Sequence, residues 1–251
     1  MPNPGLTKLA GNSYVLNAAA VPPSTIGNMD WVHVAGHELG GDKLSQWLAT
    51  ASTGSSTRYG FAETDVVLFA IRGSGTVEIS GREFPFAKNS GIYVAPGETF
   101  ALTAVDDSPV RLLIGVCPES VTEPQLNMHG SEFDETIPAR VIPLANQAQQ
   151  VTADRFYQLL VNETLGNCQV TQFIGHIPPS RAPEHFHEYE EIIMVLDGAG
   201  RFWTGNLNAP LEPGSIIYLP CRQPHCVECT SDDGMRLVGM FYPAGSPAVR
   251  Y

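Results

Sequence analysis

Short runs of apolar residues, bounded by turn-forming residues, recur along the chain. Val66–Ile71 is wholly apolar and leads to Gly73, and Ile192–Leu196 leads to the pair Asp197-Gly198. Runs of this length between turn residues are typical of buried strands, and Asp-Gly favours a hairpin turn. Asp30–Val34 instead alternates, as a half-buried strand does. The pattern therefore predicts an all-β fold.

The strand pattern occurs twice. Residues 66–75 (VVLFAIRGSG) align with residues 191–200 (EIIMVLDGAG), 125 positions later, and residues 90–96 (SGIYVAP) align with residues 214–220 (GSIIYLP), 124 positions later. A repeat of this length indicates a duplicated domain, because solenoid units are much shorter. We therefore expect two domains of one fold in tandem.

Potential metal ligands lie beside the apolar run of the second repeat. Alternate side chains of an extended strand face the same way, so His185, His187 and Glu191 share one face. His225, five residues after Pro220, is a further candidate. Imidazole and carboxylate groups bind divalent first-row metals, and burying such a group without a cation is costly. The residues predict a metal site in the second domain.

These spacings resemble the two signature motifs of the cupin superfamily. H-x-H-x3-E-x6-G and G-x5-P-x4-H are met by His185, His187, Glu191 and Gly198, and by Gly214, Pro220 and His225. The second motif departs at Arg222, where cupins usually have glycine, and at Cys229, where many have asparagine. The resemblance implies an all-β fold of two tandem cupin (jelly-roll type) β-barrels. It also implies that the metal ligands are His185, His187, Glu191 and His225.

On this resemblance the chain divides into an N-terminal arm at 1–28, an N-terminal cupin barrel at 29–118, a linker at 119–150 and a C-terminal cupin barrel at 151–251. The four ligands correspond to Gly60, Ala62, Val66 and Ala101 in the first barrel. None of these side chains binds a metal, so we expect a site only in the second barrel. His33 and His37 form a weaker metal pair. We expect the acidic part of the linker to be solvated.

Strand alternation predicts the walls of the pocket around the metal. Ile193 and Val195, Ile216 and Tyr218, and Val227 and Cys229 are expected to face inward. Beside such an apolar wall, the electrostatic attraction between one charged side chain and a charged substrate is stronger than in water. Arg181, Arg222 and Arg236 are candidates to hold a substrate carboxylate, and Tyr218 is a candidate proton donor. Glu184 and Glu190 are expected to point outward into solvent.

Three of the five cysteines, Cys221, Cys226 and Cys229, cluster around His225. Cys226 and Cys229 are formally a C-x2-C pair, which can bind zinc or form a redox pair, but no second pair completes a zinc ribbon. Residues three apart on a strand face opposite sides, so we interpret both as packing thiols. An odd number of cysteines also favours a reducing compartment.

The composition of the chain limits the kinds of molecule that it is expected to bind. The chain has 251 residues and a net charge of −12, from 26 acidic and 14 basic residues, which disfavours nucleic acid and anionic membranes. No apolar stretch is long enough to span a membrane, and the N-terminus lacks a signal-peptide pattern. We therefore expect a cytoplasmic protein with a small-molecule substrate. By analogy with cupins that associate through edge strands, we expect a homodimer.

Several functions fit this pattern. The first is a mononuclear metal-dependent enzyme that acts on a small chelating acid, keto-enol or diol, with dioxygenase-type oxidoreductase chemistry favoured. The alternatives are a redox-neutral cupin enzyme (isomerase, decarboxylase or ureidoglycine aminohydrolase-like hydrolase) and a non-catalytic binding bicupin. The ligand set favours Fe or Mn, while Ni, Co or Zn also fit. A regulator would need a DNA-binding segment, and the sequence shows no basic helix-turn-helix pattern.

Overall fold

The computed structural model describes residues 5–105, 108–118, 123–166 and 168–249. These residues form β-strands and four 3-10 helices of three residues each, η1 (Ala10–Asn12), η2 (Ala18–Ala20), η3 (His37–Leu39) and η4 (Leu144–Asn146). None of the described residues belongs to a helix long and apolar enough to cross a bilayer. The predicted all-β fold is confirmed.

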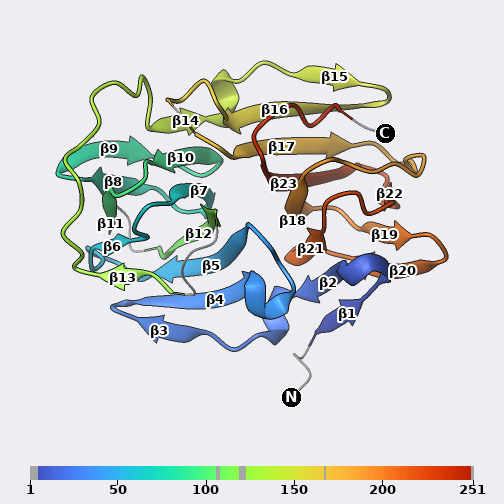
Figure 1. Cartoon of the computed structure of the whole chain (residues 1–251), viewed down its shortest axis with the longest axis horizontal. Helices are drawn as coiled ribbons and strands as arrows, with labels where there is room; N and C mark the ends of the chain where they lie inside the picture. The colour runs from blue at the N-terminus through green and yellow to red at the C-terminus, as the bar shows by residue number, and fades with distance from the viewer. Residues whose placement is uncertain (1–4, 106–107, 119–122, 167, 250–251) are drawn as a thin grey trace.

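The first half of the molecule is a jelly-roll barrel of two sheets (Figure 1). Its strands are β3 (Ser24–Ile26), β4 (Met29–Ala35), β5 (Ser45–Ala51), β6 (Tyr59–Gly60), β7 (Asp65–Arg72), β8 (Gly75–Ile79), β9 (Arg82–Phe86), β10 (Ser90–Val94), β11 (Thr99–Ala104), β12 (Val110–Cys117), β13 (Gln125–Leu126) and β14 (Val141–Pro143). The larger sheet has the order β14-β10-β7-β12-β5-β4-β3, and the smaller has the order β13-β6-β11-β8-β9. Trp31, Trp47 and Phe61 pack between them.

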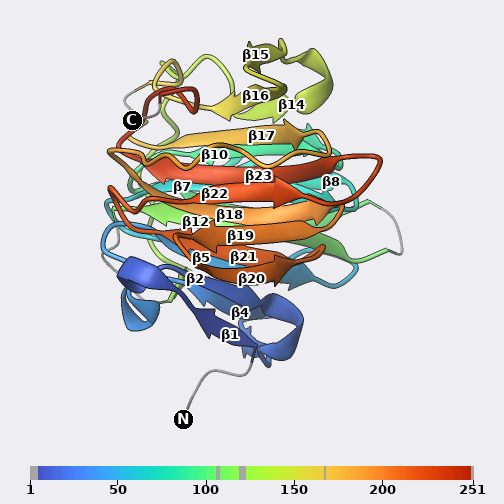
Figure 2. The ribbon, with the colours of Figure 1, turned by 90° about the vertical axis from the view of Figure 1, so that its right-hand side faces the viewer.

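The second half repeats this architecture (Figure 2). Its strands are β1 (Leu6–Lys8), β2 (Tyr14–Asn17), β15 (Gln150–Thr152), β16 (Arg155–Val161), β17 (Thr171–Ile177), β18 (Glu190–Asp197), β19 (Gly200–Thr204), β20 (Leu207–Leu211), β21 (Ser215–Leu219), β22 (Cys226–Cys229) and β23 (Met235–Tyr242). The larger sheet has the order β1-β2-β21-β18-β23-β17-β16-β15, and the smaller has the order β20-β19-β22. Phe202, Phe241 and Leu219 lie in its interior.

The first strands of the chain belong to the second barrel. Strand β2 pairs antiparallel with β21, from Tyr14 opposite Tyr218 to Asn17 opposite Ser215, and Figure 2 shows the two strands side by side. Strands β3 and β4 then join the sheet of the first barrel. The predicted arm therefore reaches the far half of the molecule and extends its large sheet.

The two large sheets pack against each other through their outer faces (Figure 1). Val67 and Phe69 of β7 belong to the same buried cluster as Ile192 and Met194 of β18. A Cβ atom at Gly115 would lie 2.1 Å from the sulfur of Met240, so a larger residue there would require this methionine side chain to move. Because β7 and β18 are covered on both faces, their sequences read as continuous apolar runs.

Two buried carboxylates, Glu190 and Asp65, each accept hydrogen bonds across this interface. Glu190 accepts hydrogen bonds from the backbone N–H groups of Asp42 (2.9 Å) and Lys43 (2.7 Å) in the first barrel. Asp65, 125 residues earlier, accepts one from Gln169 N–H in the second barrel (3.1 Å). Burial raises the pKa of both groups, and these hydrogen bonds oppose the shift. The expectation that Glu190 is solvent-exposed is therefore wrong, because its partners lie across the interface.

The segment between the barrels is packed rather than free. Residues 119–122 lie outside the described part, but β13 pairs with β6 and β14 pairs with β10. Arg140 and Glu98 form a two-pronged ion pair with N···O distances of 2.5 and 2.7 Å, and both side chains are 1% exposed. Glu98 also accepts from Asp134 N–H (2.9 Å). The acidic side chains of the segment are exposed, as expected, at Glu123, Glu132, Asp134 and Glu135.

Replacing Arg140 tests whether this ion pair holds the segment against the first barrel. Arg140→Ala leaves the Glu98 carboxylate buried without its cation, so we expect a loss of about 3–5 kcal/mol in the free energy of unfolding. Arg58→Ala is the matched control, because its pair with Glu78 is exposed and its removal costs less than about 1 kcal/mol. Urea unfolding of both variants measures the difference, and equal costs would contradict this role.

Candidate metal centre

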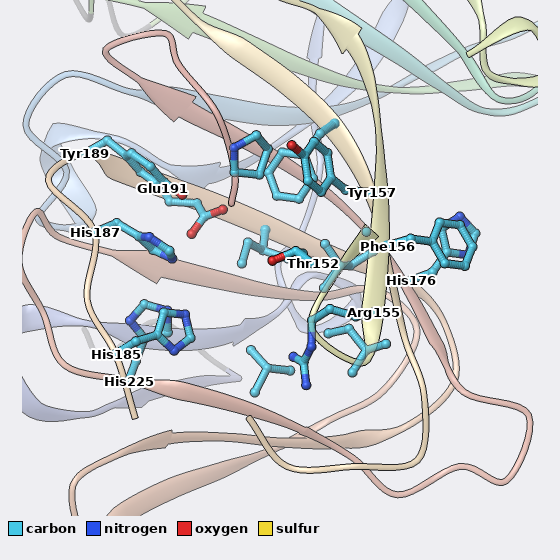
Figure 3. A pocket seen from close by; sticks show the side chains of 17 residues that line it. Thr152, Arg155, Phe156, Tyr157, His176, His185, His187, Tyr189, Glu191 and His225 are labelled. Atoms are coloured by element: carbon cyan, nitrogen blue, oxygen red, sulfur yellow. The ribbon is translucent and has the colours of Figure 1, made fainter. Parts of the chain in front are cut away.

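Three histidines meet at one end of the second barrel (Figure 3). One ligand atom from each of His185, His187 and His225 lies within 4.8 Å of the others. His185 and His225 face each other as an antiparallel pair, with N–H···O distances of 3.0 and 2.9 Å in the two directions. This double hydrogen bond fixes the backbone that carries two of the three imidazoles.

Each imidazole is also held by a carbonyl oxygen. Nδ1 lies 2.9 Å from Pro183 O in His185, 2.8 Å from Val249 O in His187 and 2.8 Å from Gln223 O in His225. A carbonyl only accepts, so each Nδ1 is the protonated donor and Nε2 carries the lone pair in the neutral ring. Burial lowers the pKa of His225 to about 3, which keeps that ring neutral. Metal-binding histidines usually have such a bond on the nitrogen that does not face the ion, because it fixes the tautomer and the orientation of the ring.

Glu191 lines the same cavity as the histidines, on the inner face of β18. Figure 3 shows its carboxylate pointing into the space beside His187. It is 3% exposed, and burial raises its pKa to about 8. Its oxygens do not belong to the group of atoms within 4.8 Å. Three neutral nitrogens beside a buried carboxyl fit a divalent cation, because a cation stabilises the ionised carboxylate.

The cavity in front of these residues is small and mostly apolar. Its volume is about 100 Å³, and its walls include Phe173, Ile193, Val227 and Leu237. Tyr189 stacks on the ring of His187 at 4.5 Å and on Phe241 at 4.0 Å, which fixes the orientation of that imidazole. The cavity suits a ligand of a few heavy atoms.

The predicted inward face is correct on two strands and wrong on the third. Ile193 and Val195 of β18, and Val227 and Cys229 of β22, belong to the barrel interior. On β21, however, Ile217 and Leu219 face inward, while Ile216 and Tyr218 belong to the cluster between the barrels. Pairing requires this, because Leu219 lies opposite Glu191 and Ile217 lies opposite Ile193. Tyr218 is therefore outside the cavity, where its ring stacks on Tyr14 at 5.1 Å.

The three arginines predicted as anchors lie elsewhere. Arg181 covers the ring of Trp203 at 4.0 Å and donates to the sulfur of Cys226. Arg236 pairs with Asp197 (2.8 Å) on the outside of the barrel, and Arg222 pairs with exposed Glu188 (2.7 Å). None of the three lines the cavity. Of the two flanking acids, Glu184 is exposed, as predicted.

Arg155 is the cationic side chain that does line the cavity, and sequence reasoning missed it. Figure 3 shows it on the wall opposite the histidines. Its side chain is 13% exposed, and its Nε donates to Asp154 (2.8 Å). This bond, with one from Ser180, lowers the pKa of Asp154 to about 2. The sequence feature that could have identified Arg155 is its position two residues before Tyr157 on β16. Tyr157 faces the interior of the barrel, and alternate residues of a strand share a face.

The first barrel keeps the backbone of this site but not its side chains. Arg222 has a φ of +63°, and its N–H donates to His187 O (2.7 Å). The corresponding Gly97 has a φ of +81° and donates to Ala62 O (2.6 Å). The motif glycine thus serves a left-handed turn, which Arg222 also adopts. Where His185 would lie, the space above Gly60 holds the methyl group of Met128.

The other sequence candidates do not join a metal group. His33 stacks on Trp47 at 5.1 Å inside the first barrel, and His37 lies in η3. Within the described residues, the three-histidine cluster is the one group of histidine, cysteine and acidic side chains with metal-binding geometry. Cys226 and Cys229 are buried and outside it, and Cys221 is exposed.

Comparisons with known proteins agree with this fold. Residues 173–241 match the family model described as "Cupin domain". The structure resembles that of protein Ylba from E. coli, with a TM-score of 0.74, 14% identity and coverage of 96% of this chain and 95% of that one. It also resembles a putative glyoxylate induced protein from Pseudomonas aeruginosa, with a TM-score of 0.77, 14% identity and coverage of 99% and 96%.

A third similar structure is oxalate decarboxylase OxdC from Bacillus subtilis, with a TM-score of 0.77, 12% identity and coverage of 94% of this chain and 78% of that one. At these identities the likeness concerns the fold. Residues 173–241 therefore match the cupin family, as the resemblance in the sequence predicts, and the chain as a whole shares the fold of these three structures.

One curated sequence also matches. It is the HTH-type transcriptional activator RhaS from Mannheimia succiniciproducens, 31% identical over 55 residues. The match spans 22% of this chain and only 20% of that protein. The described residues of this chain include no α-helix, so they contain no helix-turn-helix.

The pKa of Glu191 gives a pH dependence for the metal-free protein. Its folded pKa, about 8, exceeds the ordinary value of 4.5, so folded protein keeps a proton that unfolded protein releases. The Glu191 contribution to stability is complete below about pH 4.5 and is lost as pH rises to about 8. Wild-type protein should lose up to a few kcal/mol relative to Glu191→Gln across this range, at about 1.4 kcal/mol per pKa unit. Denaturant midpoints of the two metal-free proteins measure this, and parallel pH curves would contradict it.

Proposed function

We propose that this protein is a mononuclear metal-dependent cupin enzyme that acts on a small polar metabolite able to chelate the ion. The observation that carries this proposal is the set of three imidazoles whose Nδ1 atoms are all bonded to carbonyls, beside the buried carboxyl of Glu191. Storage or purely structural barrels have no need of such a set. His185, His187, His225 and Glu191 are the proposed ligands.

The ligand set favours Fe or Mn, and Ni, Co or Zn would also accept it. Three nitrogens and one oxygen leave open positions on a five- or six-coordinate ion, whereas Zn is satisfied by four ligands. When bound, the ion would supply Lewis acidity and, for Fe or Mn, one-electron redox chemistry. The resemblance to OxdC, which has Mn(II) centres, supports Mn as a candidate.

The residues of the chain supply binding and orientation. Arg155 faces the histidines across the cavity, where its Nε donates to Asp154 and one terminal nitrogen donates to Ser180 Oγ (3.4 Å), so the remaining N–H groups of the two terminal nitrogens can meet a ligand. A guanidinium recognises a carboxylate through two parallel hydrogen bonds, and apolar walls strengthen that attraction by excluding water. A small carboxylic acid with a second oxygen next to the carboxylate fits both ends of the cavity. Among chelating acids, keto-enols and diols, Arg155 favours the acids.

Two reaction classes fit such a substrate. Dioxygenase-type oxidation remains the favoured proposal, because open positions on Fe or Mn would accommodate both substrate and dioxygen. Redox-neutral chemistry is the second candidate, and the likeness to an oxalate decarboxylase favours decarboxylation within it. Oxygen uptake measured with metal-loaded protein and small 2-oxo and 2-hydroxy acids separates the two classes. Product formation without oxygen uptake would favour the second.

Elemental analysis tests the metal centre. Wild-type protein should contain about one equivalent of a first-row metal, and His187→Ala should lose most of it while keeping the fold. Removing the hydrogen-bond partner of a metal-binding side chain weakens metal binding about 10–100-fold, so loss of a ligand itself should weaken it at least as much. His129→Ala is the control, because that histidine is exposed and distant from the site. Full metal content in His187→Ala would refute the ligand set, and no uptake by wild-type protein would favour a non-catalytic binding protein.

Substitution of Arg155 tests the substrate class. A charge-assisted hydrogen bond contributes about 1.5–3 kcal/mol, so Arg155→Ala should weaken binding of small carboxylates about 10–150-fold. Arg236→Ala is the control, because it removes the same charge from outside the cavity. Titration of metal-loaded protein with oxalate measures both. Equal affinity in wild-type protein and Arg155→Ala would show that Arg155 does not bind the acid.

A further inference from the structure

The segment that follows β23 returns to the metal site. Residues 243–249, here called the strap, cross β17 toward the hairpin of β15 and β16 (Figure 1). Pro247, near the middle of the strap, forms part of the cavity wall. The strap is therefore a neighbour of the proposed substrate as well as of the histidines.

The strap is tied to the sheet at several points before it reaches the site. Thr171 of β17 binds Gly245 in both directions, accepting from its N–H (3.0 Å) and donating to its carbonyl (3.1 Å). Ala244 N–H donates to Gln169 O (2.7 Å). Tyr157 OH lies 3.2 Å from Ser246 Oγ. These bonds determine where the following residues lie.

The strap ends its described course at a metal ligand. Val249 O lies 2.8 Å from Nδ1 of His187, 62 residues away in the chain. The other two imidazoles are held by carbonyls only two residues before them, at Pro183 and Gln223. The carbonyl partners of His185 and His225 therefore belong to the same loops as the histidines. Of the three, His187 is the one whose Nδ1 partner comes from a distant segment, and this bond acts together with the stacking of its ring on Tyr189.

We propose that the strap is a positioning element of the metal centre, whose attachment to β17 determines how tightly the ion is held at His187. This inference rests on the proposed metal-dependent function. A carbonyl partner fixes the ring orientation and raises the basicity of the imidazole, so releasing it weakens metal binding. Coupling of this kind is reciprocal, so the state of His187 also affects how firmly the strap is held.

A substitution at Thr171 can loosen the strap without changing a residue of the metal site. It is fully buried and does not line the cavity. Thr171→Val keeps the shape of the side chain and removes both bonds to Gly245. Thr171→Ser keeps the hydroxyl and is the conservative control. Ser246→Ala, at an exposed position, releases the strap from Tyr157 and serves as a second variant that does not disturb the core.

Titration with Co(II) tests the proposal, because its visible spectrum reports its coordination. Thr171→Val should bind Co(II) about 10–100-fold more weakly than wild-type protein, with an altered spectrum, while Thr171→Ser stays close to wild type. Ser246→Ala should weaken binding in the same direction. Wild-type affinity and spectrum in both Thr171→Val and Ser246→Ala would overturn the role of the strap while leaving the metal centre in place.

Hydrogen exchange tests the reciprocal effect without any metal. In metal-free protein, His187→Ala should reduce protection of the strap amides, and His129→Ala should not. Unchanged protection in His187→Ala would also overturn the proposal. If wild-type protein binds no Co(II), the metal centre itself fails, and the inference that the strap controls metal affinity fails with it. The outcomes thus separate failure of the strap from failure of the proposed function.

Discussion

Burial of the outer faces of the two large sheets is the constraint on which the rest of the molecule depends. A cupin barrel can fill its own interior, but here each large sheet also needs a partner on its other side. The partner is the equivalent sheet of the second barrel, and at Gly115 the missing side chain leaves room for Met240 of that sheet. The first barrel, which lacks the histidines of the second, thereby covers the back of the strand that carries Glu191.

The parts predicted correctly from sequence are those whose signal is local. Turn residues, apolar runs and the 125-residue repeat determine two all-β barrels, and motif spacing brings His185, His187 and His225 together. Errors arose where burial on both faces removes the alternation. Ser215–Leu219 is buried throughout, so nothing in its sequence shows that Leu219, not Tyr218, faces the cavity. Only pairing with β18 decides it.

Side chains whose partners are distant in the chain were also beyond sequence reasoning. Glu190 looks like a solvated acid because its partners, Asp42 and Lys43, are about 150 positions earlier. The arginines near the motifs were chosen for proximity in sequence, and the one that lines the cavity comes from β16, about thirty residues before the first motif. The hydrogen bond from His187 Nδ1 to the carbonyl oxygen of Val249 belongs to the same class.

Strand β18 carries two neighbouring carboxyl groups that point to opposite faces of the sheet. Glu190 faces the first barrel and Glu191 faces the metal cavity, because adjacent side chains of a strand point to opposite faces. A slip of one residue in the pairing of β18 with its neighbours would turn both over, placing Glu190 in the cavity and the proposed ligand Glu191 in the interface. The register of this one strand therefore decides both the proposed metal site and the hydrogen bonds between the barrels.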